Sequence, residues 1–144
     1  MNVLWGIVIV LLSLPCWGGQ LLSWLWPTTA IRLQLTEDPD EVDPVYAADI
    51  RGEAVWDSFT LWVMPVAGIL LTAGSDAWAY FGLTGAGMFI YFAGRGVVTR
   101  RIMQSRGQRI GSAESVKTAY LALLVWGALG LAVLASAIVA IAKN

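Results

Sequence analysis

Four long apolar segments, separated by short polar stretches, dominate the pattern of hydrophobic and polar positions along this chain. A helix needs about 20 consecutive apolar residues to cross the hydrocarbon core of a bilayer, and each segment is too long and continuous for a buried strand. The segments cover residues 3–26, 56–73, 77–94 and 119–142, and Asp57 is the only charged residue in any of them. The pattern therefore predicts an all-α, integral membrane four-helix bundle in which residues 1–144 form one domain.

Residues that disfavour helices divide the four segments from one another. The dividing positions are Pro27, the "GSD" turn at 74–76 and the "RGQRIGS" stretch at 106–112. Pro15 and Pro65 lie inside spans, where neighbouring helices can satisfy the carbonyl that proline leaves free. We expect kinks at these two prolines and not helix ends.

The first segment has an alternative interpretation as a cleaved signal peptide, because "LSLPCWG" places small residues after an apolar run. No basic residue precedes that run, and it continues past Cys16 to Trp26. A membrane span is therefore the favoured interpretation.

The composition agrees with a protein whose solvent is the lipid bilayer. Of the 144 residues, 58% are hydrophobic and 13% are charged, and the mean hydropathy is +0.68. A soluble domain is less apolar than this, and little of the chain is left for a separate soluble core. We expect the lipid bilayer as a partner and no nucleic acid.

The basic residues predict the orientation of the bundle. Four spans place the connections 27–55 and 95–118 on one side, and both termini and the turn at 74–76 on the other. Basic residues in short loops favour the cytoplasmic side. The two long connections contain Arg32, Arg51, Arg95, Arg100, Arg101, Arg106, Arg109 and Lys117, whereas the opposite side has only Lys143. We therefore expect cytoplasmic loops and outer termini, and the compact loops suggest a bacterial inner membrane.

The two long connections carry opposite charge, which the net charge of −1 conceals. The first, extended to Asp57, is acidic, and the second contains a single acid, Glu114. Exposed ion pairs contribute only about 0–1 kcal/mol each. The acids of the first connection are Glu37, Asp38, Asp40, Glu41, Asp43, Asp49, Glu53 and Asp57. The charges form either a solvated collar on the bundle or a cytoplasmic mouth that receives an ionic ligand.

Three of these acids form a stripe if the segment before the second span is helical. Asp49, Glu53 and Asp57 are four residues apart, so they would share one face and repel mildly, with Arg51 on another face. The stripe predicts a basic partner, for which the 95–109 region is the nearest candidate. Asp57 is closest to the hydrocarbon and is either a functional group or an acid that complements the dipole in the first turn of its helix.

Small residues at helical spacing suggest close packing between helices. "YFGLTGAG" at 80–87 places Gly82 and Ala86 four residues apart, with Gly85 and Gly87 beside them. Ala128, Ala132, Ser136 and Ala140 form a line in the last span. Such residues let membrane helices approach closely, either within the chain or between the subunits of a homo-oligomer.

Missing residue types restrict the chemistry. The chain has no histidine, which argues against haem ligation by imidazole, a zinc site of ordinary ligands and a Ser-His-Asp triad. Cys16 is the only cysteine and lies in an apolar span, where it is expected to be an inert small hydrophobe. The predicted spans have no carboxylate at their centres, which disfavours a proton-coupled transporter.

The order of these features resembles the family of membrane-associated proteins in eicosanoid and glutathione metabolism (MAPEG). The resemblance covers roughly residues 30–135 and rests on topology more than on literal sequence. Its elements are "IRLQLTEDPDEVDPVYAADIRGEAVWDSFTLWVMP" for the first loop and second span, "YFAGRG" for the end of the third span, and "RIGSAESVKTAYLALLVWGALGLA" for the entry to the fourth.

The resemblance implies a trimer that binds glutathione between subunits near the cytoplasmic face. Arg51 matches the arginine that opens the family's second span, and an enzyme of this type would be a glutathione-dependent transferase. The family's glutathione-binding members have an asparagine after this arginine and a glutamate three residues further on, where this chain has Gly52 and Val55. The ligand-binding residues predicted from the charge pattern and the resemblance together are Arg51, Glu53, Asp57, Arg95, Arg109 and Ser115, and the candidate catalytic residues are Arg95 and Tyr120.

Three functions from different classes remain open at the level of sequence. The first is a MAPEG-like protein that binds glutathione or a lipid-like ligand at an arginine-rich cytoplasmic mouth. The second is a non-enzymatic membrane subunit or scaffold that assembles through small-residue helix faces. The third, a small transporter, is the least favoured because the span centres lack charge.

Overall fold

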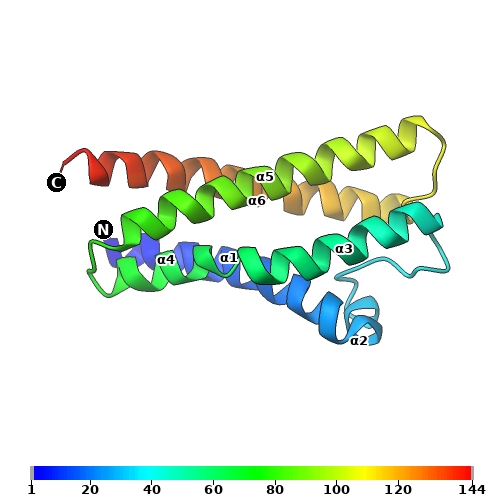
Figure 1. Ribbon diagram of the computed structural model, residues 1–144, viewed down its shortest axis with the longest axis horizontal. Helices are drawn as coiled ribbons and strands as arrows, with labels where there is room; N and C mark the ends of the chain where they lie inside the picture. The colour runs from blue at the N-terminus through cyan, green and yellow to red at the C-terminus, as the bar shows by residue number, and fades with distance from the viewer. Residues whose placement is uncertain (1, 144) are drawn as a thin grey trace.

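The computed structural model describes residues 2–143, which form a bundle of helices (Figure 1). None of these residues lies in a β-strand. The helices are α1 (Asn2–Leu25), α2 (Pro27–Arg32), α3 (Pro44–Thr60), α4 (Val63–Thr72), α5 (Trp78–Ser105) and α6 (Ala113–Ile141). Because α3 and α4 follow one another with only two residues between them, they form one of the four long columns of the bundle.

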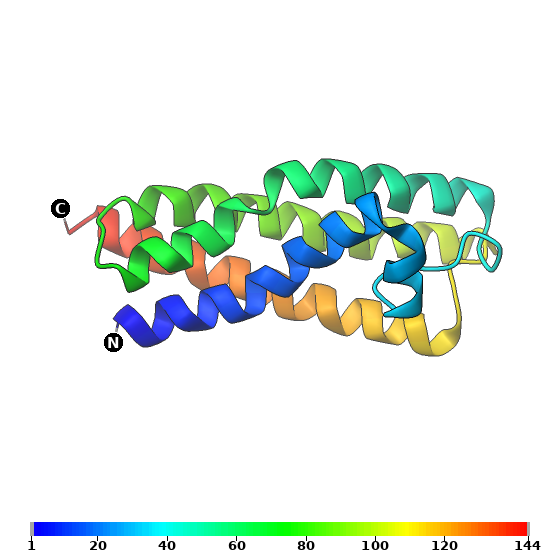
Figure 2. The same cartoon turned by 90° about the horizontal axis from the view of Figure 1, so that it is seen from below.

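The four columns confirm the integral membrane four-helix bundle. Each is long and apolar enough to cross a bilayer, and the spans are Val3–Leu25, Pro44–Thr72, Trp78–Ser105 and Ala113–Ile141. The beginning of α1 and the end of α6 lie at the same end of the bundle, as expected, while α2 and the two long connections lie at the other (Figures 1 and 2).

The helices extend further towards this second end than the sequence predicted. Residues 44–55, expected in a loop, belong to α3, and α5 continues past Gly94 to Ser105. Apolar residues mark the part of a helix that lies in hydrocarbon, whereas local caps and turns decide where it ends. Here Pro44 occupies the first turn of α3, and the Ser112 side chain accepts a hydrogen bond from the backbone N–H of Ser115 at the start of α6.

The two prolines inside spans behave differently. α1 continues without a break through Pro15. Pro65 has no N–H to donate to the carbonyl of Leu61, which accepts instead from the N–H of Met64 at 3.3 Å. The backbone of Leu61 and Trp62 keeps helical dihedral angles. The expected kink is therefore a short interruption between α3 and α4, visible as an offset in Figure 2.

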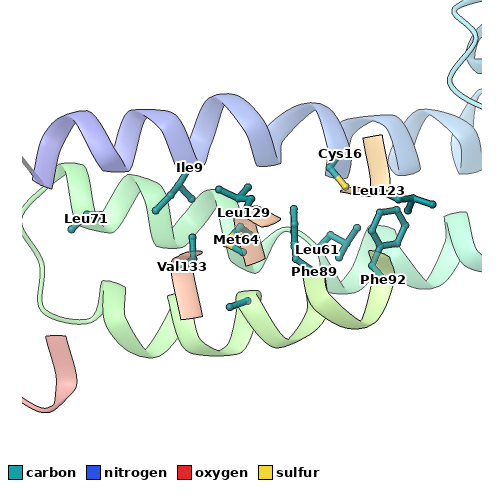
Figure 3. Close-up of a cluster of buried hydrophobic side chains, with 11 residues drawn as sticks. Ile9, Cys16, Leu61, Met64, Leu71, Phe89, Phe92, Leu123, Leu129 and Val133 are labelled. Carbon is teal, nitrogen blue, oxygen red and sulfur yellow. The ribbon is translucent and has the colours of Figure 1, made fainter. Parts of the chain in front are cut away.

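The core lies between the columns, where side chains from α1, α4, α5 and α6 meet (Figure 3). Its members are Ile9, Cys16, Leu61, Met64, Leu71, Ala86, Phe89, Phe92, Leu123, Leu129 and Val133. In a bilayer, helices associate through close packing because the lipid tails are as apolar as the core itself. Cys16 is 2% exposed and belongs to this core, as a small hydrophobe would.

Glycines set the spacing of the helices. A Cβ atom on Gly6 of α1 would lie 2.7 Å from the carbonyl oxygen of Gly68 on α4. A Cβ atom on Gly68 would lie 2.8 Å from the carbonyl oxygen of Gly6. On α5, a Cβ on Gly85 would lie 3.1 Å from the backbone of Met64. Gly82, Gly85 and Ala86 are buried and pack within the chain, whereas Gly87 of the same segment is exposed. In contrast, Ala128 and Ala132 of α6 face outwards.

We predict that Gly6→Ala destabilises the protein by about 1–3 kcal/mol, because the added methyl group forces α1 and α4 apart. Gly18→Ala is the matched control on the same helix, since a Cβ there meets nothing within 4 Å. Titration of the purified protein with sodium dodecyl sulfate measures the free energy of unfolding of both variants. Equal stability of the two variants would contradict the close contact between α1 and α4.

Candidate functional site

One arginine on α5 joins two members of the acidic stripe on α3. Arg95 donates from Nη2 to Asp49 Oδ1 at 2.5 Å and from Nη1 to Glu53 Oε1 at 2.7 Å. The fork of the guanidinium suits two acceptors one helical turn apart. The predicted basic partner of the stripe is thus found for Asp49 and Glu53. It lies within a helix, and the placement of Arg95 in a loop was wrong.

The third member of the stripe, Asp57, has no such partner. The residue is 5% exposed, and its Oδ2 atom accepts no hydrogen bond from any described residue. Asp57 lies in the last turn of α3, where an acid opposes the helix dipole. The interpretation that it complements the dipole in a first turn is therefore wrong.

The helix around Asp57 is longer than the sequence predicted. The sequence placed Asp57 at the polar start of the apolar segment 56–73, and it keeps that place, whereas the helical column Pro44–Thr72 begins before that segment. A buried carboxylate without a partner is costly in a medium of low dielectric constant. Carboxylates of this kind within membrane spans mark functional sites by default.

Asp57 lines a pocket between α3 and α5. The pocket has a volume of about 200 Å³, and its walls are Gly52, Glu53, Trp56, Asp57, Phe92 and Arg95. The four residues from α3 share one helical face, because 52 and 56, like 53 and 57, are four positions apart. Phe92 closes the α5 side and packs against the Trp126 ring of α6, with 5.8 Å between ring centroids.

Sequence reasoning selected Glu53, Asp57 and Arg95 from this pocket but missed Gly52, Trp56 and Phe92 as part of it. Gly52 and Trp56 have the same four-residue spacing as Glu53 and Asp57 of the acidic stripe. Phe92 gave no comparable signal, because it is one of many apolar residues in its span.

Arg51 lies outside the pocket. Its Nη1 atom donates to the backbone carbonyl of Ser23 at 2.7 Å, near the end of α1. Carbonyls in the last turn of a helix lack intrahelical donors, and an arginine can satisfy them. Arg51 therefore binds α1 while Arg95 binds α3, and a single chain does not bring these two arginines into one site.

Arg109 and Ser115 connect the loops at the same end of the bundle. Arg109 donates its backbone N–H to Asp43 Oδ2 at 2.7 Å, and the N–H of Asp43 donates to the Arg109 carbonyl at 2.9 Å. A longer ion pair of 3.9 Å joins their side chains. Burial raises the pKa of Glu37, although a hydrogen bond with Ser115 and the charge of Arg100 oppose this. The expected attraction between the oppositely charged connections is present here.

Tyr120 is also separate from the pocket. Its hydroxyl group donates to the Gln104 side chain at 3.0 Å, which joins α6 to the end of α5. Arg109, Ser115 and Tyr120 are absent from the pocket wall. The predicted site residues therefore fall into two groups, one around the pocket and one that fastens the connections.

Within residues 2–143, no three Asp, Glu or Cys side chains gather closely enough to hold a metal ion. Comparison of the chain with protein-family models, with curated proteins and with solved structures gives no match. The fold and the site define a four-span membrane protein with a charged pocket between two of its spans.

We predict that Arg95→Ala lowers the free energy of unfolding by roughly 2 kcal/mol, because it leaves Asp49 and Glu53 without their partner. Breaking a fully buried ion pair costs about 3–5 kcal/mol, and the Arg95 side chain is 29% exposed. Arg101→Ala is the control, since Arg101 is exposed and forms no ion pair with a described residue. Unfolding in detergent measures the loss of free energy of unfolding in each variant. An equal loss in Arg95→Ala and Arg101→Ala would show that the ion pairs do not stabilise the bundle.

Proposed function

We propose that this protein is a ligand-binding integral membrane protein whose binding site is the pocket between α3 and α5. The observation that carries the proposal is Asp57, which is 5% exposed, lines the pocket and has an oxygen atom without a hydrogen-bond partner among the described residues. Buried polar atoms are nearly always hydrogen-bonded in folded proteins. A ligand that donates to Asp57 accounts for the exception.

Glutathione is the first ligand to test, because of the MAPEG resemblance. The pocket of about 200 Å³ is smaller than the roughly 300–1,000 Å³ usual for drug-sized ligands. A tripeptide therefore needs additional walls, which a second subunit of a homo-oligomer, a trimer in the MAPEG pattern, would supply. The outward-facing Ala128 and Ala132 of α6 suit contact with another subunit.

A glutathione-dependent transferase activity is a narrower form of the same proposal. Arg95 lines the pocket and is the candidate for thiol activation, because a nearby cation lowers the pKa of a thiol. Tyr120 is the less suitable candidate, since its hydroxyl group is bonded to Gln104 outside the pocket wall.

A membrane scaffold is the second candidate function. It is favoured by the outward-facing line on α6, where Ala128 and Ala132 are exposed in a single chain. In this alternative the pocket is incidental, and assembly with another membrane protein is the activity.

We predict that glutathione at millimolar concentration raises the melting temperature of the detergent-solubilised protein. Gly52→Leu should abolish this shift, because Gly52 lines the pocket and has room for a Cβ, which meets nothing within 4 Å, so that a larger side chain there should block the site. Gly87→Leu is the matched control, since a Cβ there is equally free and lies outside the pocket wall. Arg51→Ala and Arg95→Ala then show which arginine contributes to binding.

The outcomes separate the functions. A shift that is equal in the wild type and Gly52→Leu would place glutathione elsewhere. No shift at all would remove glutathione and leave the pocket to be tested with other ligands. If Gly52→Leu changes the melting-temperature shift of no tested ligand, the scaffold is the better proposal.

We further propose that the two long connections face the cytoplasm of a bacterial inner membrane, because basic residues are concentrated there. In whole cells, a thiol reagent that cannot cross the membrane should label Ala77→Cys and not Ser105→Cys. Both positions are exposed and lie at opposite ends of the bundle, and the native Cys16 is 2% exposed and gives little background. Labelling of Ser105→Cys alone would reverse the orientation.

A further inference from the structure

We infer that the pocket between α3 and α5 takes the ammonium group of a small lipophilic amine, with Asp57 as its counter-ion. The inference rests on the proposed function, because it names the chemical class of the ligand for the same site. It follows from three properties of the pocket wall: its unmatched acceptor, its charge and its aromatic surface.

The unmatched acceptor is Asp57 Oδ2, which is buried and has no partner among residues 2–143. A carboxylate in this environment is neutralised either by a proton or by a cation. A ligand that displaces water from the pocket must therefore donate to this oxygen. An ammonium group supplies both the N–H donor and the opposite charge.

The charge of the wall disfavours an anionic group beside Asp57, so glutathione would have to enter the pocket with its ammonium group and not with its carboxylates. Glu53 and Asp57 both line the pocket, and Arg95 is its only basic residue. Both terminal nitrogens of Arg95 are already bonded, one to Glu53 and one to Asp49. An anionic group would meet two carboxylates and a guanidinium whose charge is already shared between two acids, whereas a cation meets an excess of negative charge.

Groups on the neighbouring helices do not change this balance. The charged groups that act on Asp57 are Glu53 on its own helix and Arg95 on α5. From α1, Cys16 is the titratable side chain within electrostatic range. Arg100 on α5 also acts electrostatically on Glu53, but among the described residues only Arg95 forms an ion pair with a carboxylate of the pocket wall.

The aromatic residues explain why the amine should be lipophilic. Trp56 is 65% exposed on the surface of a membrane span, while Phe92 is 5% exposed on the opposite wall. Cations are attracted to aromatic faces, and an apolar tail can lie along Trp56 towards the lipid. A phosphoethanolamine head group would place its phosphate beside Glu53 and Asp57, so a free amine suits the pocket better than an aminophospholipid.

Three probes with the same carbon skeleton and different charge test the inference: 4-phenylbutylamine, 4-phenylbutan-1-ol and 4-phenylbutyrate. Isothermal titration calorimetry at pH 8 in an uncharged detergent should show the amine binding at least tenfold more tightly than the alcohol or the acid. Asp57→Asn, which keeps the shape and removes the charge, should weaken amine binding at least tenfold. Asp76→Asn is the control, because Asp76 is exposed at the other end of the bundle and should leave amine binding unchanged.

The pH dependence of the wild-type protein provides a test that needs no variant. Protons compete with the ammonium group for the Asp57 carboxylate, so amine affinity should fall as the pH falls, while alcohol affinity stays constant. Glu53 and Arg95 face the same pocket, and Gly52→Leu should remove binding of the amine at every pH. Added phosphatidylethanolamine should not compete with the amine, and competition would show a lipid head group as the ligand instead.

The failure of this inference differs from the failure of the proposed function. Equal binding of the amine and the alcohol, or unchanged amine binding in Asp57→Asn, would overturn the ammonium site while the pocket remained a binding site. If glutathione and all three probes bound the wild type and Gly52→Leu equally, or bound neither, both proposals would be wrong.

Discussion

The fork of hydrogen bonds from Arg95 to Asp49 and Glu53 is the interaction on which the arrangement around the pocket depends. α3 is held to α1 by the Arg51 bond to the Ser23 carbonyl and by the Trp17 indole, which donates to the Ser58 carbonyl at 2.9 Å. Its connection to α5 combines these ion pairs with an apolar cluster nearer the polar end, where Tyr46 and Ile50 of α3 pack with Met103 of α5. Because the interruption before Pro65 lets α3 depart from the line of α4, these contacts set the distance between α3 and α5, and the ion pairs are the ones that lie at the pocket.

The same fork explains why Asp57 is unpaired. A guanidinium offers two terminal nitrogens, and both are taken by the acids nearer the polar end of α3. Replacing buried ion pairs by apolar residues is often neutral or stabilising, so stability alone gives little reason to retain three acids on one helical face. A third carboxylate, deeper in the bundle and without a partner, costs free energy that a function must justify.

Much of the fold could be predicted from the sequence, because apolar segments of sufficient length in a bilayer permit few structures other than helices. The helix ends could not, since the charged residues 49–53 and 95–101 continue the helical hydrogen bonding beyond the apolar segments. The stripe of Asp49, Glu53 and Asp57 followed from spacing alone. The identity of its partner did not, because selecting Arg95 from several arginines requires the rotation and axial position of α5 relative to α3.

The resemblance-based assignments show the same limit. The resemblance implies a site between subunits that contains Arg51 and Arg95, and within one chain α3 turns Arg51 towards α1 while only Arg95 reaches the pocket. Basic residues predicted at the same end of a bundle can point to different neighbours once their segments are helical, because each step along a helix rotates the side chain by about 100°.

The location of the pocket also bears on how a ligand would reach it. Gly52 and Trp56 are exposed on the side of the α3 column, and a Cβ on Gly52 would meet nothing within 4 Å. This side of the pocket therefore opens laterally, next to a tryptophan of the kind that lies at membrane interfaces. A ligand entering here would come from the lipid–water boundary and would need both an apolar part, to partition into that boundary, and a polar group for Asp57. Access from the side of the bundle thus leads to the same amphipathic class of ligand as the charge of the pocket wall.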